Sequence, residues 1–235
     1  MKKAFSLVEL SFVITLMGLF AISVVVANNF IENTKLASFI KQVNSYKSSV
    51  KLFKMSYNSL PGDIVNATSV IDNVSNNGNG DGIINWNDEN YYAWNHLSAV
   101  EYIKENFSGV ATSGVAVIND NVPEALIADG VGYSLAYVSG AESGYGYVAG
   151  SARNILVVAR ECPGCSNFRS VGQNFLTTKE AYKIDKKFDD SYAKTGLIYG
   201  AQVSGSNDCY ESFNNEYDLD ETGEQCFLMF NLEEL

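Results

Sequence analysis

An apolar stretch near the N-terminus constrains this chain more than any other feature. Two lysines, Lys2 and Lys3, come first, and the 18 residues from Leu10 to Ala27 contain no charged residue and no proline. That length is the lower limit for a helix that crosses a bilayer. Basic residues ahead of such a helix favour the cytoplasmic side. The sequence therefore predicts one membrane-spanning helix with the rest of the chain outside the cytoplasm.

Glu9 distinguishes this stretch from a plain anchor. An unpaired carboxylate costs roughly 2.5 kcal/mol or more in lipid, so Glu9 requires a partner. The alternatives for the stretch are an uncleaved single-pass anchor and a secretory signal peptide. A signal peptide needs small residues at a cleavage site after its apolar core, and Ala27-Asn28-Asn29 is a poor site of that kind.

The segment Ala4-Phe5-Ser6-Leu7-Val8-Glu9-Leu10 resembles the N-terminal motif of type IV pilins and type II secretion pseudopilins. The resemblance implies that a prepilin peptidase cuts between Ala4 and Phe5 and that the new N-terminus, Phe5, is methylated. It places Glu9 at the fifth mature position, where the family has the glutamate used in assembly. Ala4 departs from the glycine that usually precedes the cut. We expect slower or tolerated cleavage there, because alanine is also small.

The resemblance also implies a division of the chain and a function. Residues 1–4 are the leader, 5–30 the transmembrane and filament-core helix, 31–57 its amphipathic continuation, and 58–235 a periplasmic or extracellular globular domain. The expected function is a structural subunit of a type IV pilus or type II secretion pseudopilus. Its precursor lies in the bacterial inner membrane, and its partners are the prepilin peptidase and other pilin or pseudopilin subunits. The alternative is a membrane-anchored, calcium-stabilised surface-binding module, an adhesin, that does not polymerise.

The periodicity of the remaining sequence predicts an α+β fold. No proline lies between Phe5 and Tyr57, and the second half of this segment has apolar residues at spacings of three and four, which need a surface to pack on. These residues are Leu36, Phe39, Ile40, Val43, Tyr46, Val50, Phe53 and Tyr57. We expect helices at 88–106 and 177–188, and strands at 115–118, 132–139, 144–149, 154–160, 196–203 and 226–232. The prediction is pilin-like: a long N-terminal helix packed on an antiparallel meander, with long loops.

Composition argues against catalysis and nucleic-acid binding. The formal charge is −11, and it becomes −13 without the two leader lysines. Nucleic-acid affinity rests on Lys and Arg that neutralise phosphates, so no nucleic-acid site is evident. His96 is the one histidine in the sequence. A multi-histidine metal site or a Ser-His-Asp arrangement is therefore not expected. We expect a protein that is not an enzyme, with His96 exposed or half-buried and Asp185, Asp189 and Asp190 as surface or turn residues.

Four cysteines suit an exported domain in which disulfides persist. Three pairings are possible, and we favour Cys209–Cys226 with Cys162–Cys165. The first pair resembles the disulfide-bounded region near the end of many pilins, and its 18-residue loop would contribute about 3 kcal/mol. A four-cysteine zinc site normally has two Cys-x-x-Cys pairs, whereas this chain has one.

An Asn- and Gly-rich segment, residues 77–88, resembles the twelve-residue calcium loop of EF-hands. The expected ligands are the side chains of Asn77, Asn79, Asp81 and Asp88 and the carbonyl oxygen of Ile83. Two neutral asparagines and a short twelfth residue (Glu89 comes one position late) predict weak affinity, about 10⁻⁴ to 10⁻³ M. The alternative is a plain Asn/Gly turn. A less complete pattern, residues 218–224, has no twelfth ligand and lies in the acidic stretch between Cys209 and Cys226. A solvated acidic loop is the favoured interpretation there.

Overall fold

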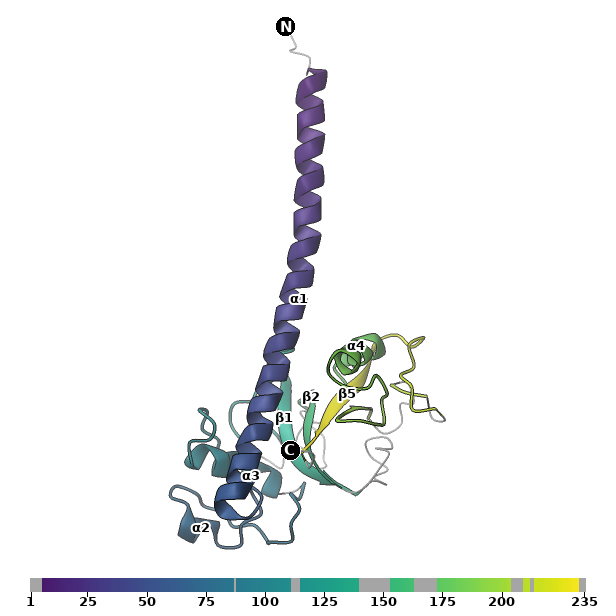
Figure 1. The fold of residues 1–235 in the computed structure, drawn as a ribbon. Coiled ribbons are helices and arrows are strands. Elements are labelled where there is room, and N and C mark those ends of the chain that lie inside the picture. Colours follow the sequence, from purple (N-terminus) through teal and green to yellow (C-terminus); the bar gives the residue numbers. More distant parts are fainter. Residues whose placement is uncertain are drawn as a thin grey trace.

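One long helix and a domain of short helices and strands make up the structure. This computed structural model describes residues 6–86, 88–110, 115–139, 153–162, 173–203, 209–211 and 214–232. Helix α1 (Leu7–Tyr57) has 51 residues, which gives a length of about 77 Å. Figure 1 shows its N-terminal half projecting from the domain and its C-terminal half lying against it. The helix ends where Asn58 adopts a left-handed conformation, with φ of 53°.

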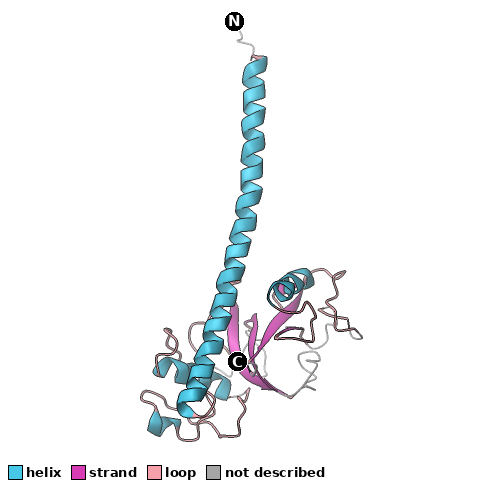
Figure 2. Cartoon of the chain, viewed as in Figure 1, coloured by secondary structure: helices cyan, strands magenta, loops and turns pink. Residues whose placement is uncertain are grey.

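The domain contains short helices and an antiparallel sheet (Figure 2). Its helices are α2 (Ala67–Val70), α3 (Glu89–Ala99) and α4 (Thr178–Phe188). Its strands are β1 (Val131–Val138), β2 (Arg153–Arg160), β3 (Leu176–Thr177), β4 (Ile198–Ala201) and β5 (Glu224–Asn231). The α+β class predicted from the sequence is confirmed.

The sheet departs from a simple meander because its last strand lies inside it. Strand β1 pairs with β2 along its whole length, from Val131 opposite Arg160 to Val138 opposite Arg153. Strand β5 then pairs antiparallel with β2 on one side and with β4 on the other, and β3 pairs with the start of β5. The C-terminal strand is thus covered by neighbours on both edges, and all its residues from Cys226 onward are buried.

The apolar stripe of α1 packs on the core of the domain as its spacing predicts, with Phe39 against the sheet and Phe53 against His96 of α3. Phe39, Val43, Tyr46, Val50 and Phe53 are buried. The remaining members of the stripe, Leu36, Ile40 and Tyr57, are partly buried against the same core. Such burial contributes about 1.5 to 3 kcal/mol for each large apolar side chain, so this face holds the domain on the helix.

Two predicted elements differ from those observed, each for a local reason. The helix predicted to reach residue 106 ends at Ala99, because Glu101 adopts φ of 60° and leaves the helical path. Residues 115–118 form isolated bridges and no strand. The side chain of Asn121 accepts the Val117 N–H and donates to the Val115 carbonyl, so it takes the place of a strand partner. The strand predicted at 144–149 lies outside the described residues.

The Cys209–Cys226 disulfide is present, as predicted, with Cα atoms 5.1 Å apart. Both cysteines are fully buried. The bridge ties the acidic segment that follows Cys209 to the start of β5. The predicted Cys162–Cys165 bridge includes Cys165, which lies outside the described residues.

Candidate functional site

The N-terminal motif forms a capping box at the start of α1. Ser6, the N-cap, accepts the Val8 N–H through its hydroxyl oxygen, and Glu9 Oε2 accepts the Ser6 N–H at 2.8 Å. Both bonds satisfy donors that a helix start leaves unpaired, and the carboxylate lies at the positive end of the helix dipole. Glu9 forms no ion pair with a described residue. The predicted cleavage residues, Ala4 and Phe5, lie outside the described residues.

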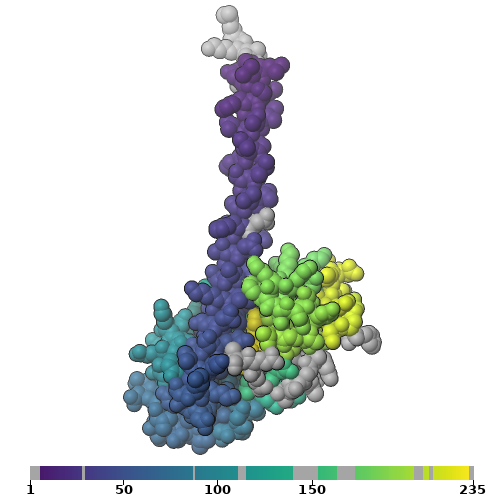
Figure 3. All heavy atoms as spheres, viewed as in Figure 1, coloured from purple at the N-terminus to yellow at the C-terminus, as the bar shows by residue number. Residues whose placement is uncertain are grey.

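The described part of the chain leaves the apolar half of α1 exposed. Its most apolar 18-residue window has a mean hydropathy of 2.5, and none of that window is buried. In the space-filling view of Figure 3 this half of the helix (purple) stands clear of the domain. Within the described residues, α1 is the one helix long and apolar enough to span a membrane. An apolar surface of this size requires an apolar partner.

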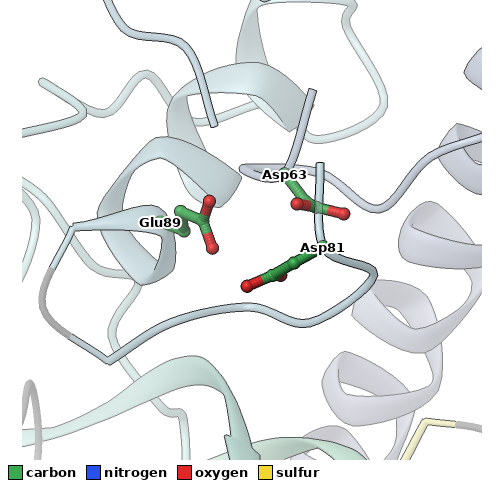
Figure 4. Close-up of side chains that lie close together, drawn as sticks. All are labelled: Asp63, Asp81 and Glu89. Atoms are coloured by element: carbon green, nitrogen blue, oxygen red, sulfur yellow. The ribbon is translucent and has the colours of Figure 1, made fainter. Parts of the chain in front are cut away.

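Three carboxylates meet beside the predicted calcium loop, as Figure 4 shows. Asp63 follows α1, Asp81 lies in the loop, and Glu89 begins α3. One ligand oxygen from each lies within 4.8 Å of the others. Asp63 is 2% exposed and Glu89 4%, whereas Asp81 is exposed. This geometry allows the cluster to hold a metal ion.

Backbone N–H groups of the loop surround the same carboxylates. Asp63 accepts from Gly80 at 2.7 Å and from Gly82 at 3.0 Å. Glu89 accepts from Asn79 at 2.8 Å and from Asn85 at 3.0 Å. The loop is therefore wrapped around two buried carboxylates. Glu89 Oε2 accepts a second bond, from Asn85 Nδ2 at 2.9 Å, whereas Glu89 Oε1 and the two Asp63 oxygens each retain a lone pair for a further bond.

A close backbone approach brings Asp63 to Glu89. Gly62, with φ of 87°, lies where an added Cβ would be 2.3 Å from the Glu89 carbonyl oxygen, so the turn requires glycine. Its N–H donates to Nδ1 of His96 on α3 at 3.0 Å. The expectation that His96 is exposed or half-buried is wrong. It is fully buried, and its contact with Gly62 holds the turn after α1 against α3.

The environment of the cluster disfavours the ionised forms of Asp63 and Glu89. Burial raises the pKa of Asp63, the N–H donors of Gly82 and Gly80 oppose this, and the Asp81 charge adds to the rise. Burial likewise raises the pKa of Glu89, with the Asp63 charge adding to it. None of the three forms an ion pair with a described Lys or Arg. A bound cation would relieve both the burial and the repulsion.

The five predicted ligands have different positions in the structure. Asn79 and Asp81 lie together, with Asn79 Nδ2 donating to Asp81 Oδ2 at 2.9 Å. Ile83 donates its N–H to Asp81 Oδ1. The side chain of Asn77 instead accepts the Thr68 N–H of α2. Asp88 caps α3 through its backbone and does not belong to the cluster.

Two members of this cluster, Asp63 and Glu89, are not among the ligands expected from the sequence. Glu89 takes the place expected for Asp88, and its position one residue late in the pattern was the available signal. Asp63 comes from outside the loop, and only its place in the turn sequence Leu60-Pro61-Gly62-Asp63 sets it apart. No spacing rule for a twelve-residue loop includes such a residue.

A second acidic cluster consists of Asp185, Asp189 and Asp190, and one oxygen from each lies within 4.8 Å of the others. The expectation that Asp185 is a surface or turn residue is wrong, because it is fully buried on α4. It accepts the Tyr217 hydroxyl and the Ser191 N–H, both at 2.7 Å. Asp189 accepts the N–H of Ile198. Asp189 Oδ2 also accepts the Leu197 N–H, so this oxygen has no lone pair left for a metal, whereas each Asp185 oxygen has one donor.

In the less complete pattern at 218–224, Asp218 accepts the Asp220 N–H within its own turn. Glu224 forms an ion pair with Arg160. These side chains do not converge on a shared point among the described residues.

Comparison with known proteins yields no relative: no protein-family model, no curated protein and no solved structure matches the chain.

Asp185→Asn is expected to reduce the pH dependence of stability. Burial raises the pKa of Asp185 to about 7, so the folded chain keeps a proton that the unfolded chain loses near pH 3.8. The free energy of unfolding therefore falls as the pH rises from about 4 to about 7, and asparagine removes this part of the fall. The free energy of unfolding is measured with urea on the full-length chain in detergent. Its value for the variant minus that for the native chain should increase by about 1 to 3 kcal/mol from about pH 5 to pH 8.

The exposed carboxylate Asp220 provides the control, since Asp220→Asn should follow the native chain. An Asp185→Asn variant that differs from the native chain by the same amount at both pH values would contradict the raised pKa.

Proposed function

We propose that this protein is a structural, non-catalytic subunit of a type IV pilus or type II secretion pseudopilus. The observation that carries the proposal is the division of α1. One unbroken helix has an apolar half that no described residue buries and a second half packed on the domain. A carboxylate, Glu9, lies at the start of the apolar half. A filament core of packed helices would cover that half and supply a partner for the carboxylate.

In this proposal the chain begins as a single-pass precursor in the inner membrane. The prepilin peptidase removes residues 1–4 and methylates Phe5. Cleavage gives Phe5 a free, positively charged amine. In the precursor the Phe5 nitrogen is part of a peptide bond and carries no charge. Because the capping box occupies Glu9 only with the neutral N–H of Ser6, the negative charge of Glu9 remains to be neutralised. The Phe5 amine of a neighbouring subunit would neutralise it in the apolar core.

This pairing would make assembly selective. An apolar core can accommodate two opposite charges that are paired. Removing either partner leaves an uncompensated buried charge, which destabilises the assembly by about 3 to 5 kcal/mol. A subunit in wrong register would leave both charges unpaired. The helices would then pack at the centre of the filament, with the domains outside.

Glu9→Gln and Glu9→Ala should both insert into the membrane and fail to assemble. Glutamine keeps an oxygen that can accept the Ser6 N–H, so it preserves the cap and removes the charge, whereas alanine removes both. Sheared surface or periplasmic filaments, detected by immunoblotting and electron microscopy, should be lost in both variants. The precursor should remain in the carbonate-resistant membrane fraction.

Glu32→Gln is the matched control, because Glu32 is the other acidic residue of α1 and lies beyond the apolar run. It should assemble normally. Normal filaments from Glu9→Gln would show that the charge is dispensable and would refute the pairing.

We further propose that Asp63, Asp81 and Glu89 bind a calcium ion that stabilises the domain. Their hard carboxylate oxygens suit calcium, and Asn79 offers an additional side-chain oxygen beside them. An ion there would tie the turn after α1, the loop and the start of α3 together. The role would be structural.

Calcium should raise the melting temperature of the native chain. At about ten times a dissociation constant near 10⁻³ M, binding adds about 1.4 kcal/mol, or a rise of roughly 3 to 6 °C for a domain of this size. Thermal unfolding of the full-length chain in detergent, with calcium or with chelator, measures the rise. Asp63→Asn should abolish it, because the variant removes a charged ligand at the buried side of the cluster.

Asp72→Asn is the control, since Asp72 is exposed in the same part of the chain and lies outside the cluster. It should retain the rise. No rise in the native chain at about ten times this dissociation constant would remove the calcium proposal and leave the filament proposal unaffected.

A further inference from the structure

The positive charge of this acidic protein is concentrated on two helices. The chain has a formal charge of −11 with 16 Lys and Arg residues, and nine of these lie on α1 and α4. On α1 they are Lys35, Lys41, Lys47, Lys51 and Lys54, and on α4 they are Lys179, Lys183, Lys186 and Lys187. A concentration of this kind does not follow from the overall composition, which is acidic.

The four lysines of α4 form one continuous surface, here called the lysine stripe. Their spacing of four, three and one residues places all of them on the same face of the helix. The opposite face, with Ala181 and Ile184, is buried against the sheet. All four lysines are exposed, and none forms an ion pair with a described residue. The lysine stripe is therefore open to an anionic partner.

The lysine stripe adjoins the part of α1 that leaves the apolar run. Lys187 Nζ donates to Asn33 Oδ1 on α1 at 3.5 Å. Figure 1 shows α4 at the end of the domain nearest the projecting half of α1. A hydrocarbon core about 30 Å thick takes about 20 helical residues, so a helix that enters it at Leu10 leaves near residue 29. Asn33 then lies about 6 Å beyond it, within the headgroup layer.

Aromatic side chains accompany the lysines at this level. Phe188 and Tyr192 are 37% and 47% exposed. The ammonium groups of Lys186 and Lys187 lie 5.3 and 5.5 Å from the ring centroids of Tyr182 and Phe188. Exposed aromatic rings combined with lysines are typical of surfaces at a membrane–water boundary.

The carboxylates close to α4 are engaged at its two ends. Glu180 accepts from the N–H and hydroxyl of Thr177 in the N-terminal capping box. Asp190 accepts from Tyr192 and Thr195 beyond the C-terminus. On α1, Glu32 lies next to Asn33 and opposes the lysines in part. The charge of the lysine stripe itself remains positive.

We propose that the lysine stripe binds the anionic phospholipid headgroups of the leaflet from which α1 emerges and holds the domain against the membrane before assembly. The inference rests on the proposed function in one respect, that α1 spans the bilayer. Lipid is the proposed partner because α1 places the lysine stripe within one Debye length of the headgroups in every inserted molecule. The acidic segment of a second copy could reach it only after two subunits meet.

The test measures the accessibility of individual lysines in the full-length chain. The chain is reconstituted into vesicles of phosphatidylcholine, and into vesicles in which about a third of the lipid is phosphatidylglycerol. Lysines are acetylated briefly, and the labelled peptides are quantified by mass spectrometry. Labelling of Lys183 and Lys187 should fall at least about threefold in the anionic vesicles, and it should recover at about 1 M salt, where the Debye length is about 3 Å.

Lys51 provides the internal control. It is exposed on α1, 18 residues past Asn33, which places it about 27 Å further from the membrane. Its labelling should be equal in both kinds of vesicle. A double variant, Lys183→Glu with Lys187→Glu, should also restore the labelling of Lys179 and Lys186, whereas Lys51→Glu should not.

Each other outcome overturns the proposal in an identifiable way. A chain that is integrated in both kinds of vesicle and labelled equally in both has no headgroup contact, and the filament proposal survives. Protection in both kinds that grows with the number of chains per vesicle identifies a second copy as the partner. A chain that does not integrate into either overturns this inference and the membrane precursor together.

Discussion

Phe39 fixes the position of α1 on the sheet. Its ring centroid lies 6.4 Å from that of Tyr133 on β1 and 5.9 Å from that of Phe230 on β5. Tyr46 repeats the contact with Tyr133 two turns later, at 5.0 Å. Gln42, between them on the same face, accepts the Tyr133 hydroxyl. Because these contacts are confined to the second half of α1, the domain leaves the first half bare. Because α1 is one unbroken helix, the position of the domain relative to the apolar half is fixed. The proposed membrane and filament contacts, and the level of the lysine stripe, all depend on this arrangement.

Charged groups at three levels along the same axis form no ion pair with a described residue. Glu9 begins the apolar half with only a neutral N–H bonded to it. Asp63 and Glu89 are buried at the far end of α1 with N–H donors but no described cation. The lysines of α4 lie between these two levels. Buried or membrane-adjacent charges of this kind are expensive to leave unpaired. An amine of a neighbouring subunit, a calcium ion and lipid headgroups are the partners proposed for the three levels.

Local patterns predicted the parts of the fold that local forces determine. The α1 stripe and the helix expected at 177–188 follow from spacing, and both are confirmed. The place of β5 between β2 and β4 could not be predicted, because strand order depends on contacts distant in sequence. The carboxylate cluster shows the same limit. Asp81 follows from the loop pattern, but Asp63 reaches it through the turn at Gly62, which buried His96 holds from another element. Burial of a polar residue by such distant contacts leaves no trace in the local sequence.

The central claim is that the chain is processed as a pilin, and the mass of its N-terminal peptide tests this most directly. The protein is purified from its own membranes and digested, and the first peptide is identified by mass spectrometry. A chain that begins at Phe5 and carries one added methyl group is the predicted result. An intact Met1, in cells that process other prepilins, would contradict the account. The protein would then be a permanently anchored surface module whose N-terminal helix never enters a filament.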